Sequence, residues 1–176
     1  MNNNLQPPTF CAVVGSFTDA IGKVNAWLAI ALMVIVSSVV VLRYGFNIGS
    51  VALQESAAYL HATFFMLGAA YTLKTDNHVR VDIFYRRYSP VKKAWVNSIG
   101  GLVLLLPMCG FIFFSSLGLV GDSWHIKEGS GDTGGLAFVY LLKGLIPVMA
   151  ATVSLQAIAD ITQNMSLLSR HYGEAC

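Results

Sequence analysis

Four long apolar stretches, nearly free of charge, limit what this chain can fold into. They cover about residues 24–42, 51–73, 95–120 and 138–161. Each is close to the roughly 20 residues that a helix needs to cross a bilayer. The composition agrees, because 55% of the residues are hydrophobic and 11% are charged, whereas about a quarter are charged in soluble domains. Lipid admits helices or closed barrels, and these stretches are too long for barrel strands.

We therefore expect an all-α integral membrane protein with four transmembrane helices. The chain forms a single membrane domain over residues 1–176, and the tails, residues 1–20 and 163–176, are left unassigned. No basic region or cleavage site of a signal peptide precedes the first stretch, so we expect that helix to remain as an anchor.

The basic residues are concentrated in one connection. Residues 74–93 hold six basic residues against two acidic ones, whereas residues 120–137 hold one basic residue against three acidic ones. Basic residues favour the cytoplasmic side of a membrane. We therefore expect residues 74–93 and both termini in the cytoplasm, and residues 120–137 outside.

The segment "KEGSGDTGG", residues 127–135, contains the spacing G-x-G-x-x-G. A dinucleotide site of this type needs a preceding strand, a following helix in a βαβ unit and an acid about 20 residues further on. The flanks here are membrane segments instead. The sequence therefore predicts a flexible, turn-rich external loop, and no nucleotide or nucleic-acid partner.

Three ionisable residues are expected in the outer layer of the membrane. Arg43 closes the first apolar stretch, while Glu55 and Lys143 lie near the starts of the second and fourth. Such groups are costly in lipid unless they are paired or functional. Two interpretations stay open: an Arg43–Glu55 ion pair with Lys143 close by, or Arg43 and Lys143 reaching out to the lipid headgroups.

Other polar residues give weaker indications. His61 has no second histidine within a span to share a haem, so a packing role is favoured over a ligand. The three cysteines, Cys11, Cys109 and Cys176, fit no metal spacing. We therefore predict no metal or cofactor site.

Glycines and prolines mark two of the predicted helices. Gly100, Gly101 and Gly110 are spaced to allow close approach of another helix, either within the chain or in a partner. Pro107 and Pro147 are expected to kink their helices.

The cytoplasmic connection alternates polar and apolar residues. His78, Arg80 and Asp82 alternate with the apolar residues Val79, Val81 and Ile83, which predicts an amphipathic stretch in the membrane interface. No nucleophile accompanies the His and Asp pair, so no catalytic residue is predicted. The candidates for contact with membrane phospholipid headgroups are Arg86, Arg87, Lys92, Lys93 and Trp95.

The runs "VLRYGFNIGSVALQESAAYL" and "FFMLGAAYTLKTDNHVRVDIFY" resemble the small, DctQ-like membrane subunit of tripartite ATP-independent periplasmic (TRAP) transporters. In that family an R-Y pair ends the first helix, an acid opens the second, and a small-residue turn precedes a His-x-x-Val-Asp signature. The matching residues here are Arg43, Tyr44, Glu55, Gly68, His78, Val81 and Asp82.

The later run "SWHIKEGSGDTGGLAFVYLLKGLIPV", continued by "LQAI", is similar to one branch of the same family. That branch has an E-x-S-x-D-x-G-G-L loop before a helix with K-x-x-I-P and a glutamine. The matching residues are Glu128, Ser130, Asp132, Gly134, Gly135, Lys143, Pro147 and Gln156. Ala137 stands where the family often has proline. The resemblance covers about residues 20–162.

The resemblance implies a subunit of the bacterial inner membrane that is not an enzyme. TRAP systems import small organic anions, mostly carboxylates, with a sodium gradient. A periplasmic binding protein delivers the substrate, and a large multi-span subunit carries the sodium and substrate sites. The small subunit resembles a scaffold for the large one, without a cofactor of its own. The structural or interface candidates are Arg43, Glu55, His78, Arg80, Asp82, Glu128, Gly134, Gly135 and Lys143.

Two alternatives remain. One is a membrane anchor of a respiratory enzyme that binds haem or quinone, against which the scarcity of histidine within the spans argues. The other is a small transporter that works alone, against which the lack of an internal repeat argues.

Overall fold

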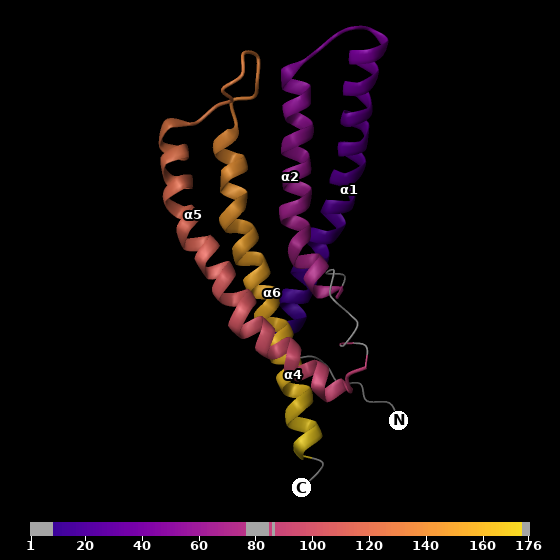
Figure 1. Ribbon diagram of the computed structural model, residues 1–176, viewed down its shortest axis with the longest axis vertical. Coiled ribbons are helices and arrows are strands. Elements are labelled where there is room, and N and C mark those ends of the chain that lie inside the picture. The colour runs from indigo at the N-terminus through magenta and orange to yellow at the C-terminus, as the bar shows by residue number, and fades with distance from the viewer. Residues whose placement is uncertain (1–8, 77–84, 86, 174–176) are drawn as a thin grey trace.

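The computed structural model describes residues 9–76, 85 and 87–173, and their regular structure is entirely helical (Figure 1). This confirms the predicted all-α class. The elements are α1 (Thr9–Gly45), α2 (Val51–Lys74), α4 (Pro90–Gly100), a π-helical segment (Gly101–Leu105), α5 (Leu106–Ile126) and α6 (Val139–Gly173).

Local signals explain several helix ends. The Ser50 hydroxyl accepts a hydrogen bond from the amide of Leu53 at the start of α2, and Ser89 does the same for Lys92 at the start of α4. Each serine satisfies a backbone donor that lacks a partner within the helix. Helix α5 ends where Lys127 adopts a left-handed conformation, with φ 47° and ψ 56°.

Three helical stretches are long and apolar enough to cross a membrane: Thr9–Gly45, Pro90–Ile126 and Val139–Ser169. Helix α2 has 24 residues and packs against α1 and α6, but its sequence includes Gln54, Glu55 and His61 and is less apolar. The structure therefore supports an all-α membrane protein, and the fourth span remains a prediction.

The helices stand largely in one row (Figure 1). Helix α1 packs against α2, α2 against α6, and α6 against α5, while α4 packs against α6. Helices α1 and α2 form one hairpin, and α5 and α6 form the other. The hairpins meet where α1 begins and α2 ends, here called the termini end. They diverge towards residues 46–50 and 127–138, here called the loop end.

The buried residues are mostly small. One cluster contains Ala70, Cys109 and Val153, and another contains Cys11, Val14 and Ala159. The aromatic side chains of Trp27, Phe111 and Phe114 are each 74% exposed. Apolar surface on this scale is typical of a membrane or protein interface, which agrees with the apolar composition.

Polar contacts hold the helices together at the termini end. The Thr18 hydroxyl donates a hydrogen bond of 2.8 Å to Oε1 of Gln156, and both side chains are buried. Within the first hairpin, Lys74 Nζ lies 2.6 Å from the Asp19 carboxylate and donates a bond of 2.8 Å to the carbonyl of Gly15. These bonds fix the register between α1 and its neighbours.

The predicted glycine face divides into two parts. A Cβ on Gly101 would lie 3.1 Å from Cδ1 of Ile161, so this glycine allows close packing of the π-helical segment on α6. Gly100 and Gly110 have no atom within 4 Å of the corresponding position. Of these three glycines, only Gly101 therefore serves packing between helices of this chain. Pro107 follows the π-helical segment directly, in the first turn of α5.

Candidate functional site

A cluster of polar contacts at the loop end is centred on Glu55, in the second turn of α2. Its carboxylate accepts a hydrogen bond from the hydroxyl of Ser130, and a second one of 2.5 Å from the amide of Leu136. We call Glu55, Ser130, Gly135 and Leu136 the Glu55 site. It joins helix α2 to the connection between α5 and α6.

The connection is folded on itself. The amide of Ser130 donates to the carbonyl of Leu136 at 2.9 Å, and the amide of Gly135 donates to the carbonyl of Asp132 at 3.0 Å. The Ser130 hydroxyl also accepts from the amide of Asp132 at 3.1 Å. Gly134 has φ +83°, a conformation that favours glycine. The sequence predicts a flexible loop, whereas the structure shows a closed turn with its own hydrogen bonds.

Gly135 allows Glu55 to reach the loop. A Cβ at this position would lie 2.6 Å from Oε1 of Glu55 and 2.5 Å from Cβ of Ser130. Any larger residue would therefore push the carboxylate or the serine away. Gly131, in the same loop, has no atom within 4 Å of the corresponding position. The two glycines thus have different roles. Gly135 leaves room for a close contact, whereas Gly131 lies beside open space.

Glu128 anchors the start of the loop to α5 and α6. Its carboxylate lies 2.5 Å from Nζ of Lys143 in α6, and its amide donates to the carbonyl of Ser123 in α5 at 3.0 Å. The hydrogen bond from Lys143 holds the pKa of Glu128 below its ordinary value, because it stabilises the ionised carboxylate.

The proposed Arg43–Glu55 ion pair is not formed. In the part of the chain that the structure describes, the hydrogen-bond partners of Glu55 are Ser130 and Leu136, and Lys143 is paired with Glu128 instead. Arg43 is exposed in the last turn of α1. A hydroxyl and a backbone amide can satisfy a carboxylate without the cost of desolvating an arginine. Contact of Arg43 with headgroups stays a prediction.

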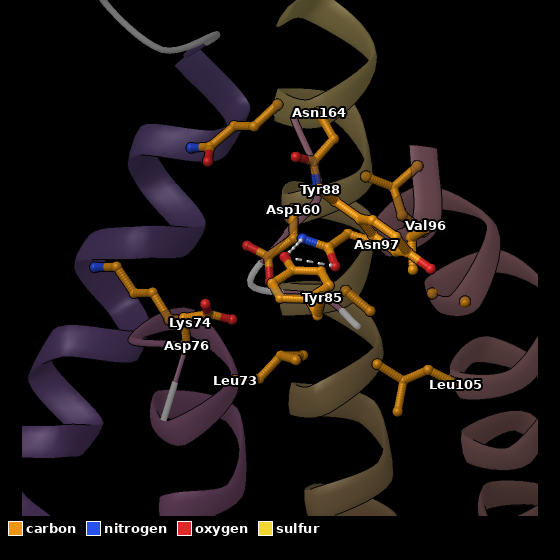
Figure 2. Close-up of a pocket in the computed structure, with 15 residues that line it drawn as sticks. Leu73, Lys74, Asp76, Tyr85, Tyr88, Val96, Asn97, Leu105, Asp160 and Asn164 are labelled. Atoms are coloured by element: carbon orange, nitrogen blue, oxygen red, sulfur yellow. Dashed lines mark hydrogen bonds between the residues drawn. The ribbon is translucent and has the colours of Figure 1, made fainter. Parts of the chain in front are cut away.

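The termini end contains a cleft of about 510 Å³ between the end of α2, α4, the π-helical segment and α6 (Figure 2). Asn97 donates a hydrogen bond of 2.9 Å to the hydroxyl of Tyr85, and Nζ of Lys93 lies 5.2 Å from the centre of the Tyr85 ring. Asp76 and Asp160 also line the cleft.

The predicted cytoplasmic candidates fall partly outside this description. His78, Arg80, Asp82 and Arg86 lie outside the described residues. The remaining headgroup candidates lie at the termini end: Arg87, Lys92 and Trp95 are exposed, and Lys93 is half-buried.

His61 is exposed on α2, and Cys11 and Cys109 are buried and free. Within the described ranges, no three His, Cys, Asp or Glu side chains are grouped as metal ligands would be.

The partners of Glu55 were missed by reasoning from the sequence. Ser130 and Leu136 lie 75 and 81 positions from Glu55, and no local spacing connects them. The available signal was the acid at the start of the second stretch and the glycine pair before Leu136, which the resemblance placed in separate motifs.

Comparison with known proteins identifies the family of this chain. Residues 32–167 match the family described as "Tripartite ATP-independent periplasmic transporters, DctQ component". The chain belongs to this family. A DctQ component is part of a transporter and is not an enzyme, and the matched residues include the whole Glu55 site as well as Arg43, Glu128 and Lys143.

A relative in Haemophilus influenzae carries the name "Putative TRAP transporter small permease protein" and is 30% identical to this DctQ chain over 95 residues. The match covers 52% of this chain and 59% of the relative, so it spans little more than half the length of either. No solved structure matches the chain.

Proposed function

We propose that this chain is the small, non-catalytic membrane subunit of a sodium-driven importer of small organic anions, and that it holds a large transport subunit in place. The proposal rests on membership of the DctQ family. In this view sodium and the carboxylate substrate bind the large subunit. A respiratory membrane anchor is not favoured, because the family is a transporter component.

The observation that best supports a scaffold is the row of helices. Its helices carry exposed apolar side chains such as Trp27, Phe111 and Phe114, and the buried clusters between them consist mainly of small residues. A row of this kind offers a large lateral surface to another membrane protein. We propose that the large subunit covers part of it and that phospholipids cover the rest.

The distribution of charges supports one orientation in the proposed bacterial inner membrane. Lys74, Arg87, Lys92 and Lys93 lie at the termini end, and basic residues favour the cytoplasm. The loop of residues 127–138 lies at the opposite end (Figure 1). We propose four spans, with both termini in the cytoplasm and this loop facing the periplasm.

We also propose that this loop contacts the periplasmic binding protein when it docks. The loop carries exposed residues, Asp132 and Thr133, next to the ordered turn. The Glu55 site and the Glu128–Lys143 pair hold the turn against α2, α5 and α6. An ordered surface loses less conformational entropy on binding than a flexible one.

The first experiment is to purify the tagged chain from its native membrane in a mild detergent and to identify the proteins that accompany it by mass spectrometry. A stoichiometric, much larger membrane protein is expected. Uptake of carboxylates by proteoliposomes should then require both chains, the binding protein and a sodium gradient. A cofactor-bearing soluble enzyme in the preparation, together with a haem absorption band, would contradict the proposal.

A further inference from the structure

We propose that Glu55 is the positioning residue of the external loop, and that it holds residues 128–136 in the shape that the soluble binding protein meets. This inference rests on the proposed docking role of the loop. It assigns that role to a residue of helix α2, which lies far from the loop in sequence.

Two donors of the loop converge on one carboxylate. The Ser130 hydroxyl and the Leu136 amide come from opposite arms of the turn, and both bond to Glu55. The arms are also bonded to each other, from the amide of Ser130 to the carbonyl of Leu136 at 2.9 Å. Glu55 therefore fixes the base of the turn as well as its distance from α2. Hydrogen bonds to an ionised acceptor are stronger than neutral ones.

Glu55 also joins the two hairpins. At the loop end, the hydrogen bonds that run from the α1–α2 hairpin to the α5–α6 hairpin, among the residues that the structure describes, end on its carboxylate. The other hydrogen bonds between the hairpins lie at the termini end, for example Thr18 to Gln156. Because the hairpins diverge towards the loop (Figure 1), loss of the Glu55 contacts would leave the turn attached only to α5 and α6.

Gly135 provides independent evidence that the contact is built into the loop. A Cβ there would lie 2.6 Å from Oε1 of Glu55, so the carboxylate occupies space that any other residue would fill. Gly131 has open space at the same point. Substitution of these two glycines by alanine therefore separates the Glu55 contact from a general effect of changing the loop.

The test uses the complete transporter in proteoliposomes, with uptake measured at increasing concentrations of its binding protein. The variants are Glu55→Gln and Gly135→Ala, and the matched control is Gly131→Ala. For the first two we expect the half-saturating concentration of binding protein to rise about tenfold, because several loop residues must be ordered on binding. The maximal rate and the stoichiometry of the complex should stay as in the wild type. Gly131→Ala, whose added Cβ has open space within the chain, is the control for loop mobility.

A second readout follows the loop directly. A spin label on Thr133→Cys, in a Cys176→Ser background, should become more mobile in Glu55→Gln and Gly135→Ala but not in Gly131→Ala. Gly135→Ala leaves the charge of the protein unchanged, so it carries the test if Glu55→Gln lowers the yield of complex. An altered loop mobility without a change in half-saturation would overturn the docking role of the site.

Two other results would overturn the inference while leaving the proposed function intact. One is an unchanged half-saturating concentration in intact Glu55→Gln and Gly135→Ala complexes. The other is a lower maximal rate with unchanged half-saturation, which would place the effect in the transport subunit. Absence of a large partner from the wild-type preparation would instead contradict the proposed function itself.

Discussion

Glu128 and Lys143 form an ion pair in which Oε2 and Nζ are 2.5 Å apart. It joins the first residue after the left-handed end of α5 to the second turn of α6. Together with the Glu55 site, it connects the turn of residues 128–136 to three helices. The two carboxylates have different partners, so their contributions can be separated experimentally.

The order of the loop should depend on pH through Glu128. Its pKa is lowered from the ordinary 4.5 by the hydrogen bond from Lys143, so the folded loop favours the ionised form. The contribution of ionised Glu128 to the stability of the folded loop is complete above the ordinary pKa. It is lost as the pH falls below this value and through the lowered pKa of the folded loop. We expect a spin label on Thr133→Cys to become more mobile as the pH falls below about 4.5.

The control for this prediction is Glu128→Gln, which removes the titrating group. Its loop should be more mobile at neutral pH and should change less on acidification. An unchanged acid response in this variant would show that another group is responsible.

Gly134→Ala should destabilise the chain through its backbone. The φ of +83° at Gly134 is unfavourable for alanine, and such a conformation costs about 1 kcal/mol. For a chain of this size that is about 2–4 °C in the midpoint of thermal unfolding. Gly131→Ala, where φ is not positive and space is open, should leave the midpoint unchanged. Equal midpoints for both variants would contradict the assigned backbone role.

Thr18→Val should weaken the contact between α1 and α6. It removes the hydroxyl that donates to Oε1 of Gln156 and leaves that buried acceptor without the bond, at a cost of about 1–3 kcal/mol. Thr63→Val is the matched control, because the Thr63 hydroxyl bonds only within α2, to the carbonyl of Tyr59. Thermal unfolding in detergent should show a clearly larger decrease for Thr18→Val.

Gly101→Val should disturb packing within the chain, whereas Gly110→Val should not. The first substitution places methyl groups against Ile161, already 3.1 Å from an added Cβ, and overpacking of this kind costs about 1–3 kcal/mol. Gly110 has open space at this point. Thermal unfolding of the isolated chain distinguishes them. A stronger effect of Gly110→Val in the complex than in the isolated chain would indicate that the partner packs there.

The apolar stretches of the sequence predict where the helices lie, but not where they begin and end. The predicted span of residues 24–42 lies inside α1, which runs over Thr9–Gly45, and all but the first residue of the predicted span 138–161 lies inside α6, which runs over Val139–Gly173. Much of the unassigned tails is therefore helical. Hydropathy marks the part of a helix that suits lipid, whereas helical turns beyond it are stabilised by contacts such as Thr18 to Gln156.

The sequence predicts which residues belong to the site, but not how they are paired. Glu55, Glu128, Gly135 and Lys143 are all among the sequence candidates, but the one partner that the sequence suggests for Glu55 is Arg43, and contact of Arg43 with headgroups is the open alternative. Opposite charges are easy to recognise in a sequence, whereas a backbone amide such as that of Leu136 leaves no mark in it. The π-helical segment at Gly101–Leu105 could not be predicted for a similar reason, since its backbone hydrogen bonds span one residue more than those of an α-helix, and this leaves no signal in the composition.

The row of helices has a consequence for how the sequence can change. Helix α5 packs mainly against α6, on one side, so the rest of its circumference, including Phe111 and Phe114, meets molecules that this chain does not encode. The residues allowed at those positions are therefore set by the molecules that pack against them. We expect these positions to vary together with the partner or with the lipid composition of the host membrane, whereas Glu55, Gly135 and Gly101 are constrained by contacts inside the chain itself.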